Sequence, residues 1–293
     1  MTRRSRLQPH GTSLRLERVV VSHGWFQTPP FAWDEHAGVL LRRERVGGRA
    51  VELRITESGQ SVLVEPSVEL TPNEWRVSKQ RVRRMLQLDV DLDGFLEATA
   101  RVDEGLADDL RSVGAGRLLA GASLWEDVVK AICGTNVAWR QAVNMIRRIT
   151  ELERDGTFPE PGRLIEAGEE GLREHARVGY RAPYLVGAAR MAADGEISSL
   201  DAVATHLPPD ELMRRLTSIP GIGPTSARFA SYLRGRFDVG LAIDSATVPA
   251  AAERWFDGDR PTNDEIAAKV EPAGEWAAAT LYWATMRRWQ QSL

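Results

Sequence analysis

The 293-residue sequence contains little lysine and almost no cysteine. Lysine and arginine together number 38, and only Lys79, Lys130 and Lys269 are lysines, so 35 of them are arginines. This scarcity leaves few candidates for amine chemistry, although the arginine excess by itself is equally well explained by a GC-rich genome. Cys133 is the only cysteine, which excludes an internal disulfide and a four-thiolate zinc or iron–sulfur site.

The sequence also lacks long hydrophobic runs and a strong net charge. No apolar run approaches the ~20 residues that a membrane-spanning helix needs, and the basic start at residues 1–6 is followed by no apolar secretory segment. We therefore expect a soluble intracellular protein that does not bind membranes. With a net charge of -3, the protein as a whole does not attract a polyanion electrostatically. Any nucleic-acid binding must therefore rest on local groups.

The pattern of apolar residues changes near Thr71 and divides the chain in two. Strand-length segments rich in β-branched residues precede it, and apolar residues at helical spacing follow it. Strands followed by helices indicate an α+β fold. The predicted strands are 14–22, 38–46, 51–56 and 61–65; the predicted helices are 74–87, 101–112, 123–134, 138–153, 181–194, 209–218, 225–235, 245–256 and 274–290; the predicted helix caps are Ser123, Asp201 and Asp210.

The most distinctive segment is residues 216–227, with the sequence LTSIPGIGPTSA. One helix is predicted to end here, a tight turn uses Gly221 and Gly223, and a second helix begins at Pro224, where the missing N–H of proline costs nothing. Such a hairpin directs free backbone amides and a positive helix end toward one point, and these features bind phosphate. An ordinary turn between two helices is the alternative interpretation.

Asp244 lies nineteen positions after Thr225, behind an apolar lead-in and before a predicted helix. Aspartate at the start of a helix commonly caps it. Taken by itself, its position therefore predicts a helix cap.

The hairpin followed by Asp244 resembles the helix-hairpin-helix (HhH-GPD) superfamily of DNA glycosylases, whose invariant aspartate occupies this place. The resemblance is closest to the 8-oxoguanine DNA glycosylase branch, and it extends more loosely to the bacterial 3-methyladenine DNA glycosylase II enzymes. Five further segments are similar to that branch in the same order: 87–92 (QLDVDL), 114–119 (GAGRLL), 132–136 (ICGTN), 179–184 (GYRAPY) and 274–277 (GEWA).

The resemblance implies a domain organisation. It places a small N-terminal antiparallel β-sheet domain, similar to the TATA-binding protein, at residues 1–85. A mostly helical HhH-GPD catalytic domain would follow at 86–293, with the hairpin at 209–235.

The resemblance also assigns roles in DNA binding. Asn136 would fill the gap left by an extruded nucleotide, Tyr180 would wedge the neighbouring base step, and Arg181 would reach the orphaned base. As alternatives, Asn136 ends a helix, Tyr180 is a core residue and Arg181 lies on a solvated face. The predicted DNA-binding residues are Gly221, Gly223, Thr225, Asn136, Tyr180, Arg181 and Arg140.

By the same resemblance, Asp244 is the catalytic residue. As the N-glycosidic bond stretches, positive charge builds on the deoxyribose, and a carboxylate stabilises this charge or orients the attacking water. Bifunctional members carry a nucleophilic lysine one residue after the position of Pro224, where this sequence has Thr225. No Schiff base can form at that position. We predict no metal and no required cofactor, with a monovalent cation at the hairpin as the one ion that the resemblance allows.

The base pocket departs from the 8-oxoguanine branch as well. Ala278 stands where that branch reads the base edge with a polar side chain, which argues against 8-oxoguanine as the substrate. Phe229 replaces a small residue, and Tyr282 occupies the place of a stacking aromatic residue. The predicted pocket residues are Trp25, Phe229, Ala278 and Tyr282.

The sequence therefore predicts a monofunctional DNA glycosylase that acts on double-stranded DNA containing a modified base and leaves an abasic site. The base would be alkylated, oxidised, or bulkier, such as a hypermodified base of viral DNA. The alternative is a non-catalytic helix-hairpin-helix protein that binds damaged or structured DNA, and a bifunctional lyase is the third hypothesis. We expect a monomer in the cytoplasm, associated with the nucleoid in a bacterium.

Overall fold

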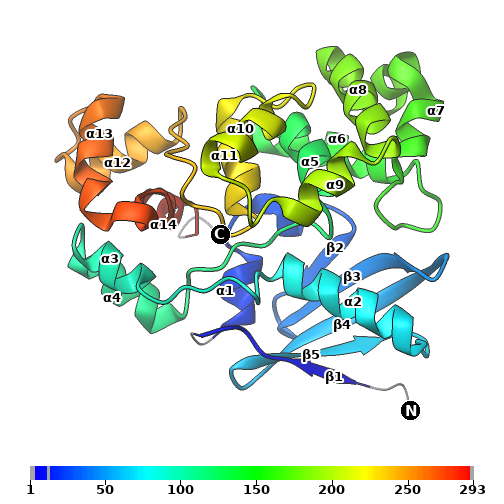
Figure 1. Ribbon diagram of the computed structural model, residues 1–293, viewed down its shortest axis with the longest axis horizontal. Helices are drawn as coiled ribbons and strands as arrows, with labels where there is room; N and C mark the ends of the chain where they lie inside the picture. Colours follow the sequence, from blue (N-terminus) through cyan, green and yellow to red (C-terminus); the bar gives the residue numbers. More distant parts are fainter. Residues whose placement is uncertain (1–3, 12–13, 291–293) are drawn as a thin grey trace.

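The computed structural model describes residues 4–11 and 14–290. An antiparallel five-stranded sheet lies at one end of the molecule, and helices cover one of its faces and extend beyond it (Figure 1). This arrangement confirms the α+β class. The strands, in the spatial order β1-β5-β4-β3-β2, are β1 (Ser5–Leu7), β2 (Phe31–Asp34), β3 (Val39–Val46), β4 (Arg49–Ser58) and β5 (Ser61–Pro66).

The central hairpin of the sheet follows directly from its sequence. Gly47 and Gly48 join β3 to β4 with positive φ angles of 60° and 77°, as a two-residue turn that matches the strand twist requires. Alternate residues of β4 are buried, so one face of the sheet packs on the interior. The predicted strands at 38–46, 51–56 and 61–65 are therefore confirmed.

The predicted strand at 14–22 is wrong, because residues 16–20 form a helix, α1 (Leu16–Val20). Its β-branched residues suggested a strand. Leu16, Val19 and Val20 are buried at positions i, i+3 and i+4, which is the spacing of one helix face. Tertiary packing against the sheet thus overrides the local preference.

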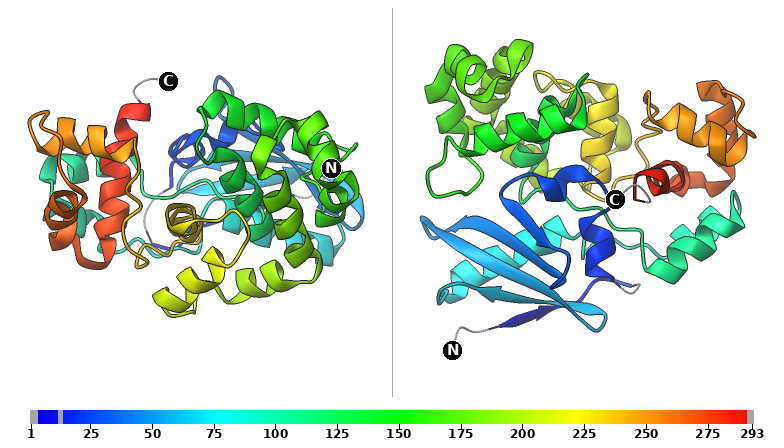
Figure 2. Two further views of the ribbon diagram at one scale, coloured as in Figure 1. Left: turned by 90° about the horizontal axis from the view of Figure 1, so that it is seen from above. Right: turned by 180° about the vertical axis from the view of Figure 1, so that it is seen from behind.

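The helical part forms two groups. One consists of α5 to α11, and the other brings α3 and α4 beside α12 to α14 from the far end of the chain (Figure 2). The helices after α1 are α2 (Pro72–Met85), α3 (Phe95–Ala100), α4 (Glu104–Val113), α5 (Leu124–Gly134), α6 (Trp139–Thr150), α7 (Pro161–Gly171), α8 (Ala182–Ala193), α9 (Glu196–Val203), α10 (Pro209–Thr217), α11 (Pro224–Tyr232), α12 (Thr247–Trp255), α13 (Asn263–Val270) and α14 (Ala277–Gln290), with 3-10 turns η1 (Gly24–Gln27), η3 (Gly179–Arg181) and η4 (Glu271–Trp276) and the π-helix η2 (Leu172–Ala176).

All predicted helices are present, and α3, α7, α9 and α13 were not predicted. Ser123 caps α5 as expected, since its side chain accepts from the amide of Glu126. Asp201 does not cap its own helix, because it lies inside α9; its Oδ2 instead accepts from the amide of Leu124 in the first turn of α5. Asp210 lies in the first turn of α10 rather than at its cap. No described helix is long and apolar enough to cross a membrane.

A buried ionic cluster joins the sheet to α5. The guanidinium of Arg42, on β3, donates to both carboxylate oxygens of Glu126 at 2.9 and 2.7 Å and to Glu44 at 2.6 Å. Lys130 lies 2.7 Å from the same Glu126 carboxylate. All four side chains are almost completely buried. Such a cluster aligns the sheet with the helices, because a displaced partner would leave a buried charge uncompensated.

The predicted division between residues 85 and 86 stays a prediction. The sheet, α1 and α2 share one core, which Leu88 and Leu119 also join from beyond that boundary. Trp25, from the N-terminal segment, belongs instead to the core of the helices. The two parts are therefore interlocked through these side chains.

Candidate functional site

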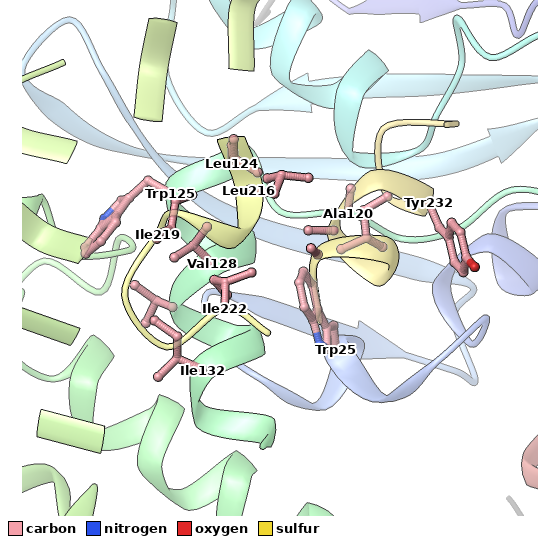
Figure 3. Close-up of a cluster of buried hydrophobic side chains, with 14 of the residues drawn as sticks. Trp25, Ala120, Leu124, Trp125, Val128, Ile132, Leu216, Ile219, Ile222 and Tyr232 are labelled. Atoms are coloured by element: carbon pink, nitrogen blue, oxygen red, sulfur yellow. The ribbon is translucent and has the colours of Figure 1, made fainter. Parts of the chain in front are cut away.

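The hairpin between α10 and α11 is held rigidly on α5. Ile219 and Ile222 of the turn are buried and point toward Val128 and Ile132 of α5 (Figure 3). Gly221 has a φ of +83°, and a Cβ atom built there would lie 2.8 Å from Cβ of Tyr184. Both the backbone conformation and the close approach therefore require glycine at this position.

The same turn has backbone N–H groups that are available to a ligand. Within the described part of the chain, no acceptor receives the amides of Gly221 and Gly223. The amide of Thr225, in the first turn of α11, has no partner within its own helix, as for any such position. These amides and the positive end of α11 form a surface suited to a backbone phosphate.

Asp244 has the capping role that its position suggested, and its catalytic role stays a prediction. Its Oδ1 accepts from the amides of Ala246 and Thr247 and from the Thr247 hydroxyl, each at 2.9 Å. These bonds cap the start of α12 and fix the orientation of the carboxylate. All hydrogen bonds that the described residues donate to this side chain end on Oδ1, so Oδ2 is available to a ligand.

Asp244 lies at a cavity of about 110 Å³ between the two helical groups. Phe229 and Tyr232 of α11 line one side, and α14 lines the other. Four residues predicted from the sequence, besides Asp244, meet here: Thr225, Phe229, Ala278 and Tyr282. Side chains that the sequence analysis did not identify also line it: Tyr232, Ala242, Ala246, Thr247, Leu281, Thr285 and Met286.

Two aromatic rings face one another in this cavity. The rings of Phe229 and Tyr282 are 6.3 Å apart between centroids and 22° from parallel. We call this pair the aromatic slot. Stacked bases of a DNA strand rise by about 3.4 Å, so a base between the two rings needs about 7 Å. The 6.3 Å separation of the two rings is therefore close to the spacing that a flat base needs.

Trp25 does not line this cavity. It is 4% exposed, and its ring packs edge-on against Phe229 with the centroids 5.8 Å apart. His23 packs on Phe229 in the same way at 5.3 Å. The prediction of Trp25 as a pocket residue therefore needs correction: Trp25 lies behind the slot and supports it.

The hydroxyl groups of Tyr232 and Tyr282, the two tyrosines that line the cavity, are used within the protein. Tyr232 donates to the carbonyl of Gly240 at 2.5 Å and accepts from the amide of Ala242 at 2.9 Å. Tyr282 donates to the carbonyl of Ser22 at 3.1 Å. Burial raises the pKa of both tyrosines, so both hydroxyls stay protonated. The slot therefore presents mainly aromatic faces and methyl groups to a ligand.

The loop from Thr135 to Ala138, between α5 and α6, carries Asn136. We call it the gap loop. Asn136 is exposed and has a φ of +48°, a conformation that is uncommon for residues other than glycine. Tyr180 is 54% exposed beside it, and hydrogen bonds with the side chains of Thr135 and Asn136 lower the pKa of Tyr180. Arg140 is exposed on the first turn of α6.

Arg181 has a different environment from the one that sequence predicts. It is only 6% exposed, and its guanidinium donates to the carbonyls of Thr135 and Val178. Its charge also lies 4.5 Å from the ring centre of Tyr180. The side chain thus holds the gap loop. In this structure it lies neither on a solvated face nor where it has direct access to a base.

The described residues contain no group of three or more His, Cys, Asp or Glu side chains placed to hold a metal ion. Burial raises the pKa of the Cys133 thiol to about 12, so this thiol is not a ready nucleophile.

No protein-family model matches the chain, and no curated protein matches it. Solved structures do. The 3-methyladenine DNA glycosylase of Archaeoglobus fulgidus has a TM-score of 0.73 at 21% identity, over 98% of this chain and 99% of that one. The 8-oxoguanine glycosylase/lyase of Clostridium acetobutylicum, in complex with double-stranded DNA containing cytosine opposite 8-oxoG, has a TM-score of 0.69 at 19% identity, over 96% and 93%.

A third similar structure covers a smaller part of the chain. The Schizosaccharomyces pombe 3-methyladenine DNA glycosylase Mag1, in complex with abasic DNA, has a TM-score of 0.51 at 20% identity, over 65% of this chain and 97% of that one. The chain therefore has the fold of these DNA glycosylases.

Proposed function

We propose that this protein is a DNA glycosylase that hydrolyses the N-glycosidic bond of a modified base in double-stranded DNA and leaves an abasic site. One observation carries the proposal: Asp244, with one carboxylate oxygen open, lines the cavity that holds the aromatic slot, beside a hairpin suited to grip phosphate. The similar solved structures are of DNA glycosylases, and two of the three were solved with DNA.

The chemistry follows from this placement. A base between Phe229 and Tyr282 would bring its deoxyribose near Asp244, which lines the same cavity. As the bond from C1′ to the base nitrogen breaks, its electron pair leaves with the base, and the carboxylate stabilises the positive charge on the sugar. Water then adds to C1′ and gives up a proton. A base that was neutral before cleavage leaves as an anion and takes this proton, whereas a base that carried a positive charge leaves neutral and the proton goes to the solvent. The reaction needs no cofactor.

Thr225 supports a hydrolytic rather than a lyase mechanism. Its side chain lines the same cavity as Asp244. A hydroxyl there cannot form a Schiff base with the abasic sugar. Lys130, the only lysine near the slot, is buried in the ionic cluster with Glu126.

The walls of the slot support recognition by stacking. Electron-rich aromatic faces attract positive charge, which favours an alkylated base that carries a charge over a neutral oxidised one. A bulkier base is the second candidate, because Ala278 lines the cavity with a methyl group where a longer side chain would obstruct it.

Base release identifies the substrate and tests catalysis. The protein is incubated with duplexes that each contain one alkylated or oxidised base, and with genomic DNA carrying hypermodified bases, and released bases are identified by mass. Wild-type protein should release a modified base and leave alkali-labile sites. Asp244→Asn should lower this rate at least about 100-fold while still binding a duplex with a tetrahydrofuran abasic analogue.

The alternatives give other results. If no DNA in the panel loses a base, and the protein binds these duplexes equally well with Asn at position 244, it is a non-catalytic binding protein. A covalent complex between wild-type protein and abasic DNA after borohydride treatment would establish the bifunctional lyase instead.

A further inference from the structure

The indole of Trp139 connects the gap loop to the N-terminal segment. Trp139 is the first residue of α6, three positions after Asn136. Its Nε1 donates a 2.7 Å hydrogen bond to Oε1 of Gln27. Its ring lies directly on Gly24, where an added Cβ atom would be 2.5 Å from Cζ2 and 2.7 Å from Nε1 of the indole. Only a residue without a side chain allows this approach.

The turn under Trp139 also supports the aromatic slot. Gly24 and Gln27 are the two ends of η1, and Trp25 lies between them. His23 caps this turn through the amide of Trp25, and its Nε2 lies 2.7 Å from the carbonyl oxygen of Leu119. His23 and Trp25 flank Gly24 in the sequence, and both rings pack edge-on against Phe229.

The opposite end of the gap loop is held by α8. Arg181, at the N-terminus of α8, donates to the carbonyl of Thr135. Asn136 therefore sits in its left-handed conformation between two anchored ends, Thr135 on α8 and Trp139 on η1. Strained conformations of this kind persist where the surroundings hold them.

We propose that Trp139 and Gly24 are positioning residues that hold the gap loop at a fixed distance from the aromatic slot, so that filling the duplex gap and seating the extruded base occur together. The proposal rests on the proposed glycosylase function. A contiguous series of contacts carries it: the indole lies on η1, the rings of η1 lie on Phe229, and Phe229 faces Tyr282. Displacing reacting groups by about 1 Å can cost on the order of 100-fold in rate.

The first experiment measures how the gap loop acts on a duplex, in the absence of base excision. The probe is a duplex with a tetrahydrofuran abasic analogue and 2-aminopurine as the opposite base, whose fluorescence rises when it loses its stacking. Wild-type protein and Asp244→Asn should raise the fluorescence equally. Gly24→Ala should reduce the rise to less than half, because the new methyl group displaces Trp139. Gly162→Ala is the matched control, since a Cβ there meets nothing within 4 Å.

Two further variants separate the coupling from a general loss of fold. In Gly24→Ala/Trp139→Ala the clash is gone, so the double variant should behave like Trp139→Ala alone rather than worse. Gln27→Leu keeps the size of the side chain and removes only the acceptor of the indole N–H. It should reduce the fluorescence rise and leave the circular dichroism spectrum unchanged. The proposal can therefore still be tested if Gly24→Ala does not fold.

The second experiment measures base release, which depends on the aromatic slot. Release of 7-methylguanine from dimethyl sulfate-treated calf thymus DNA should fall about tenfold or more in kcat for Gly24→Ala and Gln27→Leu, with KM changed less. Wild-type fluorescence and wild-type base release in both variants would overturn the inference. If wild-type protein raises the fluorescence but releases no base from any DNA, the proposed function fails while the fluorescence arm still decides the effect of Trp139 on the gap loop. Absence of any wild-type response to the probe would overturn the inference, and base release would then decide the proposed function by itself.

Discussion

At the residue scale, Asp244 has a structural role at the start of α12 and, in the proposed function, a chemical one. Its Oδ1 holds the start of α12, its Oδ2 accepts no hydrogen bond from the described residues, and the residue lines the cavity. The capping bonds fix the direction of the second oxygen. The backbone amides that donate these bonds are already ordered as part of the helix. Preorganised charge of this kind does not have to reorient as the reaction proceeds.

Thr225 permits a gain-of-function prediction at the same scale. In Thr225→Lys, a primary amine would line the cavity that also holds Asp244. We expect the variant, unlike wild-type protein, to form a covalent complex with abasic DNA in the presence of borohydride. Thr225→Met, of similar length but without the amine, is the control. An equal yield of complex from both variants would contradict the placement of residue 225.

At the element scale, the hairpin depends on its two glycines for different reasons. Gly221 is in the left-handed region beside Tyr184, whereas Gly223 has a φ of -85° and open space where a Cβ would lie. The first glycine therefore serves the fold of the turn. Gly223 instead leaves open space in which a ligand can approach the backbone amides of the turn.

This difference predicts opposite phenotypes for two alanine substitutions. Gly221→Ala should lower the free energy of unfolding by roughly 1–3 kcal/mol, measured by urea denaturation. Gly223→Ala should leave it unchanged and weaken binding of an unmodified duplex, since the methyl group would keep a phosphate away from the amides. Equal affinity of Gly223→Ala and wild-type protein for that duplex would argue against phosphate contact here.

At the scale of the whole molecule, the sheet and the helices depend on buried polar groups at their junction. His23 is the clearest case, because burial lowers its pKa to about 3 while its ring links Leu119 to η1. In the unfolded chain, histidine titrates near pH 6.5. The unfolded state therefore binds more protons than the folded state between these pKa values, and folding stability falls as the pH falls through this range.

The expected loss is about 2 kcal/mol between pH 7 and pH 5. It can be measured by urea denaturation at several pH values. His23→Gln should flatten the dependence over this interval, whereas substitution of the exposed His36 by Gln should leave it as in wild-type protein. A wild-type stability that does not change between pH 7 and pH 5 would be inconsistent with a buried neutral imidazole.

The sequence by itself determined the features that depend on neighbours along the chain. The hairpin, the β3–β4 turn at Gly47 and Gly48, and the helix start beside Asp244 all follow from local backbone preferences. Resemblance then assigned Trp25, Phe229, Ala278 and Tyr282 to one pocket, and the structure brings the last three together with Thr225 and Asp244.

Tertiary structure decided what depends on contacts between distant residues. Local preference predicts a strand at 14–22, and burial on the sheet makes part of it a helix, α1. Trp25 lies behind the slot, Arg181 turns inward to the gap loop, and Trp139 lies on Gly24, more than one hundred residues away. No local pattern encodes these contacts, because each arises only when the packing of the sheet and helices brings the two partners together.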